Sequence, residues 1–234
     1  MMKIADFKGI FSKAYLEVES VENPFKDFYL IKLKLPNGYT WSAGEHVNIS
    51  FPDRKYMGRK WKTFSIASID KEGYMLIATR TGEEASRYKS HLIDLRPGER
   101  VGVRGPFGSF KIADTSSPSV LVASGVGITP MRALIKAMAE DSNREINLVF
   151  AASDYYLFAD EIEAMTVENS NIKLFKTSNR ADTLEKVADL AAEYGNKAYY
   201  YMSGSNSMIN STEDVLNNKE ISKKRIVKDP FIGY

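Results

Sequence analysis

The 234-residue sequence predicts a two-domain protein: an antiparallel β-barrel, residues 1–113, followed by an α/β domain with a doubly wound parallel sheet, residues 114–234. Two observations carry this prediction. The first half is a series of short segments with strand-like patterns separated by turn residues, and the second half alternates apolar strands with amphipathic helical segments. The polar, turn-prone stretch at 114–118, Asp-Thr-Ser-Ser-Pro, lies between the two patterns and marks the expected boundary.

The first half is expected to consist of short strands joined by turns. Strands are predicted at Tyr15–Val21, Phe28–Leu35, His46–Phe51, Thr63–Ser68, Tyr74–Thr79 and Arg100–Arg104. Turn residues such as Pro36-Asn37-Gly38 and Arg96-Pro97-Gly98 separate them, and a helix is expected near Ser86–Leu95. Many short strands with few helices are typical of a small barrel.

The second half has the pattern of an α/β domain. Strands are predicted at Ser119–Ala123, Ile146–Ala151, Ile172–Lys176, Ala198–Met202 and Ile226–Lys228, and helices at Pro130–Glu140, Phe158–Met165, Leu184–Tyr194 and Ser207–Leu216. The first of these helices places Met131, Leu134, Ile135 and Met138 on one face. Strands that alternate with helices in this way favour a parallel sheet covered on both faces.

The composition excludes several kinds of chemistry. The chain has 32 basic and 30 acidic side chains, a formal net charge of +2, so its bulk charge does not predict nucleic-acid binding. It contains no cysteine, which rules out thiolate nucleophiles and cysteine-ligated iron–sulfur clusters within this sequence. Electron transfer would therefore need a bound organic cofactor. No apolar run is long enough to span a membrane, and a cytoplasmic location is expected.

A glycine-rich loop is the sharpest local motif. Gly125-Val126-Gly127-Ile128-Thr129-Pro130 follows a predicted strand directly and leads into a helix, with Pro130 expected at the first helical position. Glycines permit a tight bend and the close approach of a pyrophosphate, and a helix N-terminus offers free N–H groups. The third glycine and the acidic residue of a standard NAD fingerprint are missing, so a plain glycine-rich turn is the alternative interpretation.

Several segments, taken in order, resemble the ferredoxin–NADP reductase-like flavoprotein superfamily. Lys62-Thr63-Phe64-Ser65 is similar to its flavin motif, and Gly82–Ser86 to the loop that holds the flavin pyrophosphate. The others are Gly105-Pro106-Phe107-Gly108, the loop Ser124–Pro130, and Met202-Ser203-Gly204-Ser205. The chain departs from the family pattern where Lys62 replaces arginine, Phe64 replaces tyrosine, Ser203 replaces cysteine and Ser205 replaces proline. A lysine lacks the bidentate fork of arginine, and a serine cannot form a thiolate.

The resemblance implies an FAD-binding barrel followed by an NAD(P)-binding domain. It assigns cofactor binding to Lys62, Thr63, Phe64, Ser65, Thr79, Arg80, Gly82, Ala85, Ser86, Gly125, Gly127, Thr129, Ser178, Arg180 and Gly204. FAD is favoured over FMN because the Gly82–Ser86 segment resembles a pyrophosphate loop. A solvated Arg80 and a simple helix cap at Ser86 are the alternative interpretations of that segment.

Three residues are the candidate catalytic residues: Ser65, Ser203 and Tyr234. The resemblance implies that Phe64 stacks on the flavin ring while Ser65 and Ser203 tune the ring edges, with Thr129 near the nicotinamide. Tyr234 would cover the flavin face as a gate, or else only pin the terminus.

The choice between NADH and NADPH stays open in the sequence. By resemblance, the 2′-phosphate of NADPH would sit beyond the strands ending near Ala151 and Lys176. Ser178 and Arg180 suit that phosphate, whereas Asp154 suits a ribose hydroxyl and repels phosphate. Ordinary polar loops are the alternative for each of these residues.

The function implied by the resemblance is hydride transfer from NAD(P)H to FAD, with electrons passed onward to a separate acceptor. That acceptor would be a ferredoxin- or flavodoxin-like protein or a small molecule. Lys55, Arg59 and Lys60 form either a docking patch for an acidic partner or a solvated basic loop. A free-flavin reductase and a non-catalytic nucleotide-binding subunit that kept the fold are the rival hypotheses.

Overall fold

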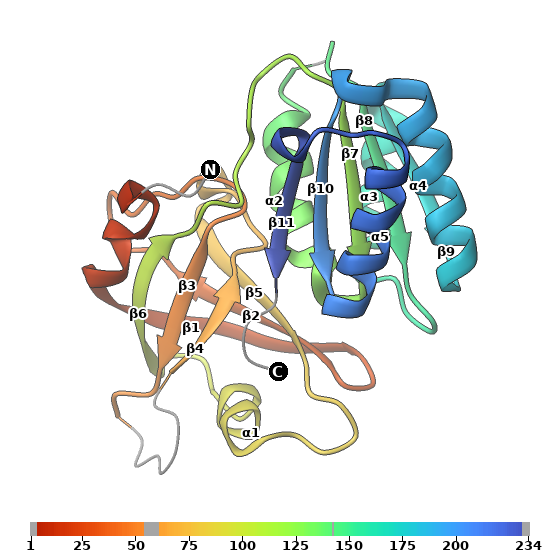
Figure 1. Cartoon of the computed structure of the whole chain (residues 1–234). Helices are drawn as coiled ribbons and strands as arrows, with labels where there is room; N and C mark the ends of the chain where they lie inside the picture. The colour runs from red at the N-terminus through yellow and green to blue at the C-terminus, as the bar shows by residue number, and fades with distance from the viewer. Residues whose placement is uncertain (1–3, 54–60, 142, 231–234) are drawn as a thin grey trace. The chain divides into compact units, whose positions relative to one another are not determined.

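The computed structural model describes residues 4–53, 61–141 and 143–230. The chain divides into two compact units with the break between Lys111 and Ile112 (Figure 1). The predicted fold class is confirmed, because the first unit holds a six-stranded antiparallel sheet and the second a five-stranded parallel one. The assignment of FAD to residues 1–113 and of NAD(P)H to residues 114–234 stays a prediction.

The sheet of the first unit runs in the order β4-β3-β6-β1-β2-β5. Its strands are β1 (Lys13–Phe25), β2 (Phe28–Lys34), β3 (His46–Ser50), β4 (Trp61–Ser65), β5 (Tyr74–Arg80) and β6 (Arg100–Phe107). A bridge between Ile66, just after β4, and Ile77 of β5 brings the two edge strands together. The sheet thereby curls into a barrel, and β4 ends at Ser65 rather than at the predicted Ser68.

The hairpin of β1 and β2 shows why the alternating pattern specifies this sheet. Ile31 and Leu33 have no exposed surface and belong to the barrel core. Lys32 and Lys34 lie on the opposite face, where they pair across the hairpin with Glu19 and Glu17. The register is fixed by both faces, since a shift by one residue would exchange core and solvent positions.

Short helices complete the first unit: η1 (Ile4–Phe11), η2 (Asp70–Glu72) and α1 (Arg87–Ile93). The helix predicted near Ser86–Leu95 corresponds to α1. Ser86 is its N-cap, with its Oγ accepting from the amide of Lys89 at 3.4 Å. Tyr88 and Leu92 anchor α1 because both side chains are buried in the barrel core.

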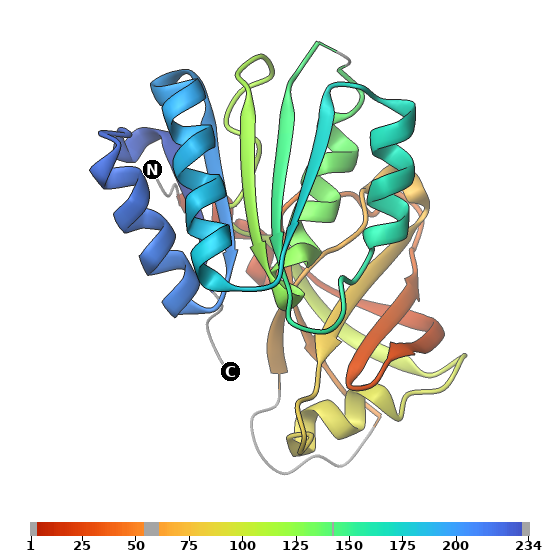
Figure 2. The same cartoon turned by 90° about the vertical axis from the view of Figure 1, so that its right-hand side faces the viewer.

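The parallel sheet of the second unit runs in the order β11-β10-β7-β8-β9. Its strands are β7 (Ser119–Ser124), β8 (Ile146–Ala151), β9 (Ile172–Thr177), β10 (Tyr199–Gly204) and β11 (Ile226–Pro230). Its helices are η3 (Gly125–Gly127), α2 (Ile128–Met138), α3 (Ala159–Glu168), α4 (Arg180–Tyr194), η4 (Gly195–Lys197), α5 (Asn206–Asn218) and η5 (Lys223–Arg225). Figure 2 shows α2 and α3 on one face of this sheet and α4 and α5 on the other.

The strand order reverses between β7 and β10, because β7 leads to β8 on one side whereas β10 and β11 extend the other side. Ligands of open α/β sheets bind in the crevice beyond the carboxyl ends of the strands at such a switch point. The fold therefore directs attention to the two segments that follow β7 and β10.

Two helix starts differ from the sequence prediction. α2 begins at Ile128, so Pro130 is its third residue rather than its first. This position costs no hydrogen bond, because the first four amides of a helix have no intrahelical partner. α4 begins at Arg180 rather than Leu184, since the side chain of Asn179 accepts from the amide of Asp182 at 2.9 Å and caps the helix.

The predicted apolar face of α2 is confirmed. Met131, Leu134 and Ile135 have no exposed surface, and Met138 is also buried. The other face of the sheet packs on α4 and α5 through a cluster that includes Val187. Every helix in the described ranges falls short of the length and hydropathy that a membrane crossing requires.

An ion-pair triad joins α2 to α3. Arg132, whose side chain is 4% exposed, donates from Nε and Nη2 to the two carboxylate oxygens of Glu161 at 2.6 and 2.7 Å. Lys136 donates to the same carboxylate at 2.8 Å. Burial by itself raises the pKa of Glu161, but the bonds from Arg132 and Lys136 hold this pKa below its usual value of 4.5. The triad therefore stabilises the fold when Glu161 is ionised.

We expect Glu161→Gln to lower the free energy of unfolding at neutral pH by about 1–3 kcal/mol, because it leaves the buried guanidinium of Arg132 without its charge partner. The folded-state pKa is depressed, so the difference from wild type should be full above the unfolded pKa and shrink as pH falls through the folded pKa. Urea unfolding at several pH values measures it. The control is Glu163→Gln, on the same helix as Glu161. It removes the exposed pair between Glu163 and Lys176 of β9 and should change stability by less than about 1 kcal/mol. Equal losses in both variants would contradict this account.

Candidate functional site

The glycine loop after β7 packs backbone against backbone on the end of β10. A Cβ atom on Gly127 would lie 2.1 Å from the carbonyl oxygen of Ser203. On the facing segment, a Cβ atom on Gly204 would lie 2.8 Å from the Cβ of Ser124. Both positions therefore require glycine, and together they bring the two segments into contact at the switch point of the sheet.

The loop presents a helix N-terminus at this crevice. η3 passes directly into α2, whose first turn contains no acidic side chain. Gly125 has a φ of +54°, and a Cβ there would meet nothing within 4 Å. The helix N-terminus and the open space at Gly125 are features that favour a phosphate group. The hydroxyl of Thr129 donates to the carbonyl of Val126 at 2.7 Å, so its proton is used within the loop.

Ser203 and Gly204 end β10 beside this loop. The side chain of Ser203 is buried, and its Oγ donates to Oδ2 of Asp229 at 3.1 Å. Asp229 is 4% exposed and lies directly beside Ser203 in the register of β10 and β11. The sequence prediction missed Asp229, since nothing in the sequence places the short β11 next to β10. Ser205, at the position of the family proline, caps α5 by accepting from the amide of Met208 at 3.3 Å.

The residues weighed for NADH or NADPH lie at the same carboxyl edge of the sheet. The carbonyl of Thr177 accepts from the amide of Ala152 at 3.1 Å and from the hydroxyl of Tyr156 at 2.9 Å, which joins the loops after β8 and β9. Asp154 is exposed in the first of these loops, and its Oδ1 accepts from Ser153 at 3.4 Å. The edge thus carries a carboxylate within the segment that follows β8.

Arg180, a cation at this edge, has a partner on α5. Arg180 opens α4, and its guanidinium donates to the hydroxyl of Ser207. Ser178 is exposed just before the cap of the same helix. Both residues follow β9, and their contact with a 2′-phosphate stays a prediction. A 2′-phosphate at Arg180 would have to share the guanidinium with Ser207.

In the first unit, the flavin-motif strand β4 lies against a buried tyrosine of α1. The ring of Phe64 is 9% exposed and stacks against Tyr88, with centroids 6.2 Å apart. The Nζ of Lys62 lies 5.7 Å from the centre of the Tyr88 ring. Thr63 donates to Oδ1 of Asn48 at 2.7 Å. Phe64 is thus part of the barrel core, and its stacking on a flavin stays a prediction, as does the role of the buried Ser65.

Tyr88 fixes this arrangement and was not among the predicted site residues. Its hydroxyl donates to the carbonyl of Ile49 at 2.6 Å, and its ring lies 4.8 Å from that of Phe51. The side chain is 1% exposed. Its position on the same helix face as the other buried anchor, Leu92, could have indicated a core role, but not its contact with β4.

The predicted phosphate loop follows β5. Gly82 is exposed with a φ of +78°, and a Cβ there would meet nothing within 4 Å. Of the neighbouring predicted residues, Thr79 is buried within β5, Ala85 is partly exposed and Ser86 caps α1. Arg80 is partly exposed and also paired, because its Nε donates to both carboxylate oxygens of Asp27 at 3.1 and 2.9 Å.

A pair of lysines accompanies this loop. Lys89 of α1 donates from Nζ to the carbonyl of Arg80. Burial lowers the pKa of Lys89, and the charge of Lys62 lowers it further. A desolvated ammonium group with a second cation near it favours a bound anion, because an anion relieves both costs. This chemistry fits a flavin phosphate, and Lys89 is a residue that the sequence prediction missed.

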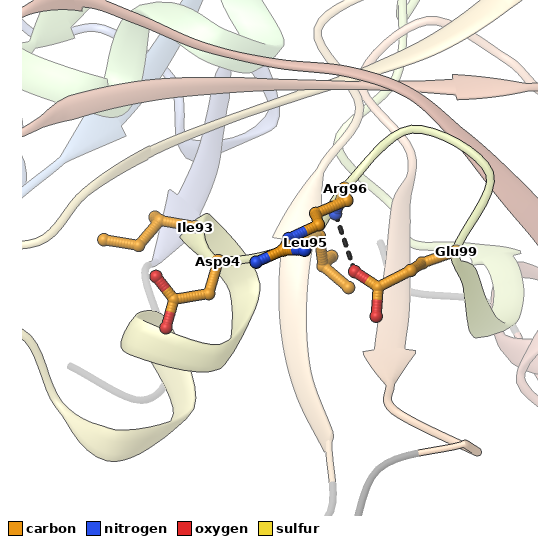
Figure 3. Close-up of a pocket in the computed structure, with 5 residues that line it drawn as sticks. All are labelled: Ile93, Asp94, Leu95, Arg96 and Glu99. Carbon is orange, nitrogen blue, oxygen red and sulfur yellow. Dashed lines mark hydrogen bonds between the residues drawn. The ribbon is translucent and has the colours of Figure 1, made fainter.

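A hollow of about 560 Å³ in the first unit is lined by other residues: Ile93, Asp94, Leu95, Arg96 and Glu99. It lies at the end of α1, where the amide of Arg96 donates to Glu99 at 2.7 Å (Figure 3). None of the predicted site residues lines it. Its charged lining does not resemble the mostly apolar wall of a cofactor pocket.

Some predicted residues lie outside the described ranges. These are the candidate gate Tyr234 and the basic segment with Lys55, Arg59 and Lys60. Within the described ranges, no group of three or more histidine, aspartate or glutamate side chains is placed to hold a metal ion.

Comparison with known proteins agrees with this geometry. Residues 121–214 match the family described as the oxidoreductase NAD-binding domain, which covers the glycine loop, the crevice edge and β10. The chain is 26% identical over 175 residues to tetrachlorobenzoquinone reductase of Sphingobium chlorophenolicum, covering 72% of this chain and 52% of that protein. It is 23% identical to a component of the Na⁺-translocating NADH-quinone reductase of Colwellia maris, covering 74% and 71%. The chain thus spans about half the length of the first relative.

A solved structure extends the likeness to both units. Ferredoxin–NADP⁺ reductase from Plasmodium falciparum superposes with a TM-score of 0.80 at 15% identity, covering 95% of this chain and 97% of that one. These matches define a two-domain protein whose second unit contains the oxidoreductase NAD-binding domain. The resemblance drawn from the motifs is confirmed for the two-domain fold and for the oxidoreductase NAD-binding domain.

We expect Gly127→Ala to weaken NAD(P)H binding at least tenfold and to destabilise the second unit by about 1–3 kcal/mol, because its methyl group would overlap the Ser203 carbonyl and separate the two segments. Flavin binding should be unchanged. Titration with each nucleotide and chemical denaturation measure these effects.

Gly195→Ala is the matched control. Its φ is +50° and its Cβ would meet nothing within 4 Å, so it carries a backbone cost of about 1–3 kcal/mol without any overlap. It should leave nucleotide binding intact. Equal loss of flavin and nucleotide in Gly127→Ala would contradict the assignment of the loop to the nicotinamide nucleotide.

Proposed function

We propose that the chain is an NAD(P)H-dependent flavoprotein reductase. The second unit binds the nicotinamide dinucleotide, the first unit binds FAD, and the electrons leave to an acceptor outside residues 1–234. A flavin, when bound, supplies the redox chemistry of this reaction by accepting a hydride and releasing its electrons one or two at a time.

The observation that carries this proposal is the glycine contact at the switch point. Gly127 lies against the Ser203 carbonyl, and the segment falls within the region that matches the oxidoreductase NAD-binding domain. A turn of this kind holds the pyrophosphate on the N-terminus of α2, while the end of β10 lies beside it. Proteins named as NADH-dependent reductases among the relatives support the same activity.

The residues of the first unit supply the contacts that a flavin dinucleotide needs. Lys62 and Lys89 provide positive charge and Gly82 an unobstructed backbone. The buried hydroxyl of Ser65 follows Phe64 on β4 as the candidate partner of the ring edge. FAD is preferred over FMN because the Gly82–Ser86 segment resembles a pyrophosphate loop.

The acceptor is a separate ferredoxin- or flavodoxin-like protein or a small molecule. The chain contains no cysteine, so it cannot hold a cysteine-ligated cluster of its own. Among the relatives, one is named for a chlorinated quinone and several for quinones. A quinone is therefore the first small molecule to test as acceptor.

The purified chain should be yellow, with flavin absorbance that is bleached anaerobically by NADH or NADPH and restored by an added quinone. Separate titrations with the two nucleotides, followed by absorbance, measure this reaction. Colourless protein that oxidises NAD(P)H only when flavin is added would instead identify a free-flavin reductase. Bound flavin that neither nucleotide bleaches would overturn reductase activity and favour a non-catalytic role.

The carboxylate at the end of β8 favours NADH as the donor. Asp154 is exposed in the segment that follows β8, where a carboxylate accepts from ribose hydroxyls and repels a 2′-phosphate. The cation of the same edge, Arg180, already has a partner in Ser207.

Asp154→Asn should therefore raise kcat/KM for NADPH about fivefold relative to NADH, since it removes one exposed repulsion of about 1 kcal/mol. Steady-state kinetics with both nucleotides provide the measurement. Asp160→Asn, a neighbouring exposed carboxylate in the first turn of α3, serves as the control and should leave the ratio unchanged. A change in Asp154→Asn that is equal for the two nucleotides would count against this assignment.

A further inference from the structure

The turn between β1 and β2 is tied to the segment that enters the phosphate loop. Phe25 pairs with Phe28, so Lys26 and Asp27 form a two-residue turn. The carbonyl of Asp27 accepts from the amide of Thr81 at 2.8 Å. Its carboxylate accepts from Nε of Arg80, at 3.1 and 2.9 Å, and from the amide of Gly82 at 2.9 Å. Asp27 thus accepts hydrogen bonds from three consecutive residues, Arg80 to Gly82, at the end of β5.

The turn itself is held in an uncommon conformation by a neighbour. Lys26 has a φ of +41°, in the left-handed region that few residues other than glycine adopt. The side-chain amide of Asn23 donates to the carbonyls of Lys26 and Phe28, each at 2.7 Å. These bonds fix the direction in which Asp27 points. The two hydrogen bonds of Asn23 therefore hold the turn in the conformation that lets Asp27 reach the end of β5.

The pairing also sets what Arg80 can do. Its guanidinium lies 4.8 Å above the ring of Phe28 as well as on Asp27. Its carbonyl accepts from Lys89, so both ends of the residue are fixed. Bonds from Arg80 and Gly82 keep the pKa of Asp27 below 3.8, although burial by itself raises it. The carboxylate is therefore ionised at neutral pH, and the charge of Arg80 is largely balanced before any ligand binds.

We propose that Asp27 is a positioning residue for the phosphate part of the flavin: it fixes the backbone of Arg80–Gly82 and, through it, the place of Lys89. This inference rests on the proposed function, because it concerns the same flavin site. Arg80 then holds the loop in place through its bonds to Asp27. Lys62 and Lys89 supply the positive charge that faces the phosphate.

The test is titration of the flavin-free full chain with FAD, FMN and riboflavin. Asp27→Ala removes the bonds to Arg80 and Gly82, so the Kd for FAD and FMN should rise at least tenfold. The Kd for riboflavin, which has no phosphate, should change less than about twofold. This split separates positioning of the phosphate loop from general damage to the barrel, which would weaken all three flavins together.

Asp27→Asn is the milder variant in case alanine impairs folding. Its amide keeps one acceptor oxygen for Gly82 but turns an NH₂ donor toward the Nε–H of Arg80, so the phosphate-dependent Kd should rise at least threefold. Glu19→Gln is the matched control on the same hairpin, since it removes the charge of the pair with Lys32, and it should leave all three values unchanged.

The outcomes separate this inference from the function it rests on. A wild-type chain that binds neither FAD nor FMN overturns the proposed function. A wild-type chain that binds them while both Asp27 variants bind them equally well, or lose riboflavin to the same degree, overturns only the role of Asp27. Selective loss of the phosphorylated flavins supports it.

Discussion

The approach of one backbone to another at the switch point is the constraint on which the second unit depends. Gly127 lies so close to the Ser203 carbonyl that no side chain fits between them, and Gly204 faces Ser124 under the same restriction. These contacts join the N-terminus of α2 to the end of β10. The contact at the switch point is thus made largely by main-chain atoms, whose positions are set by the register of the parallel strands.

Charge pairing organises the surroundings of both candidate sites in a similar way. Arg132 on α2 is neutralised by Glu161, and Arg80 at the end of β5 by Asp27. In each pair, the carboxylate balances the charge of an arginine that lies near a candidate ligand loop. Lys62 and Lys89 add positive charge near Gly82, and the charge of Lys62 together with burial lowers the pKa of Lys89.

The sequence was sufficient for the fold because its signals are local. The two hydrophobic periods separate the barrel from the α/β unit, and the buried face of Met131, Leu134 and Ile135 follows from helical spacing alone. The capping signal that sets the true start of α4, Asn179 three residues before Asp182, is also local, although the prediction missed it. The motifs located both candidate loops for the same reason, since each is a contiguous segment.

The partners of the site residues were not predictable in this way. Asp27 and Arg80 are 53 residues apart, and Ser203 and Asp229 are 26 apart. Such pairs depend on which strands become neighbours, and no local pattern encodes that. Phe64 illustrates the same limit, because alternation placed its ring on one face of β4 but could not show that Tyr88 already lies there.

The arrangement of the described residues favours a reaction in which the protein positions cofactors rather than exchanging protons. The buried carboxylate beside the end of β10, Asp229, accepts a hydrogen bond from Ser203. The hydroxyl of Thr129 donates its hydrogen bond to the carbonyl of Val126 in the adjoining loop. Hydride transfer between two organic rings needs no general acid or base, only correct placement and exclusion of water. A chain without cysteine and with only two histidines is suited to that chemistry, because rigid backbone contacts supply the placement that it requires.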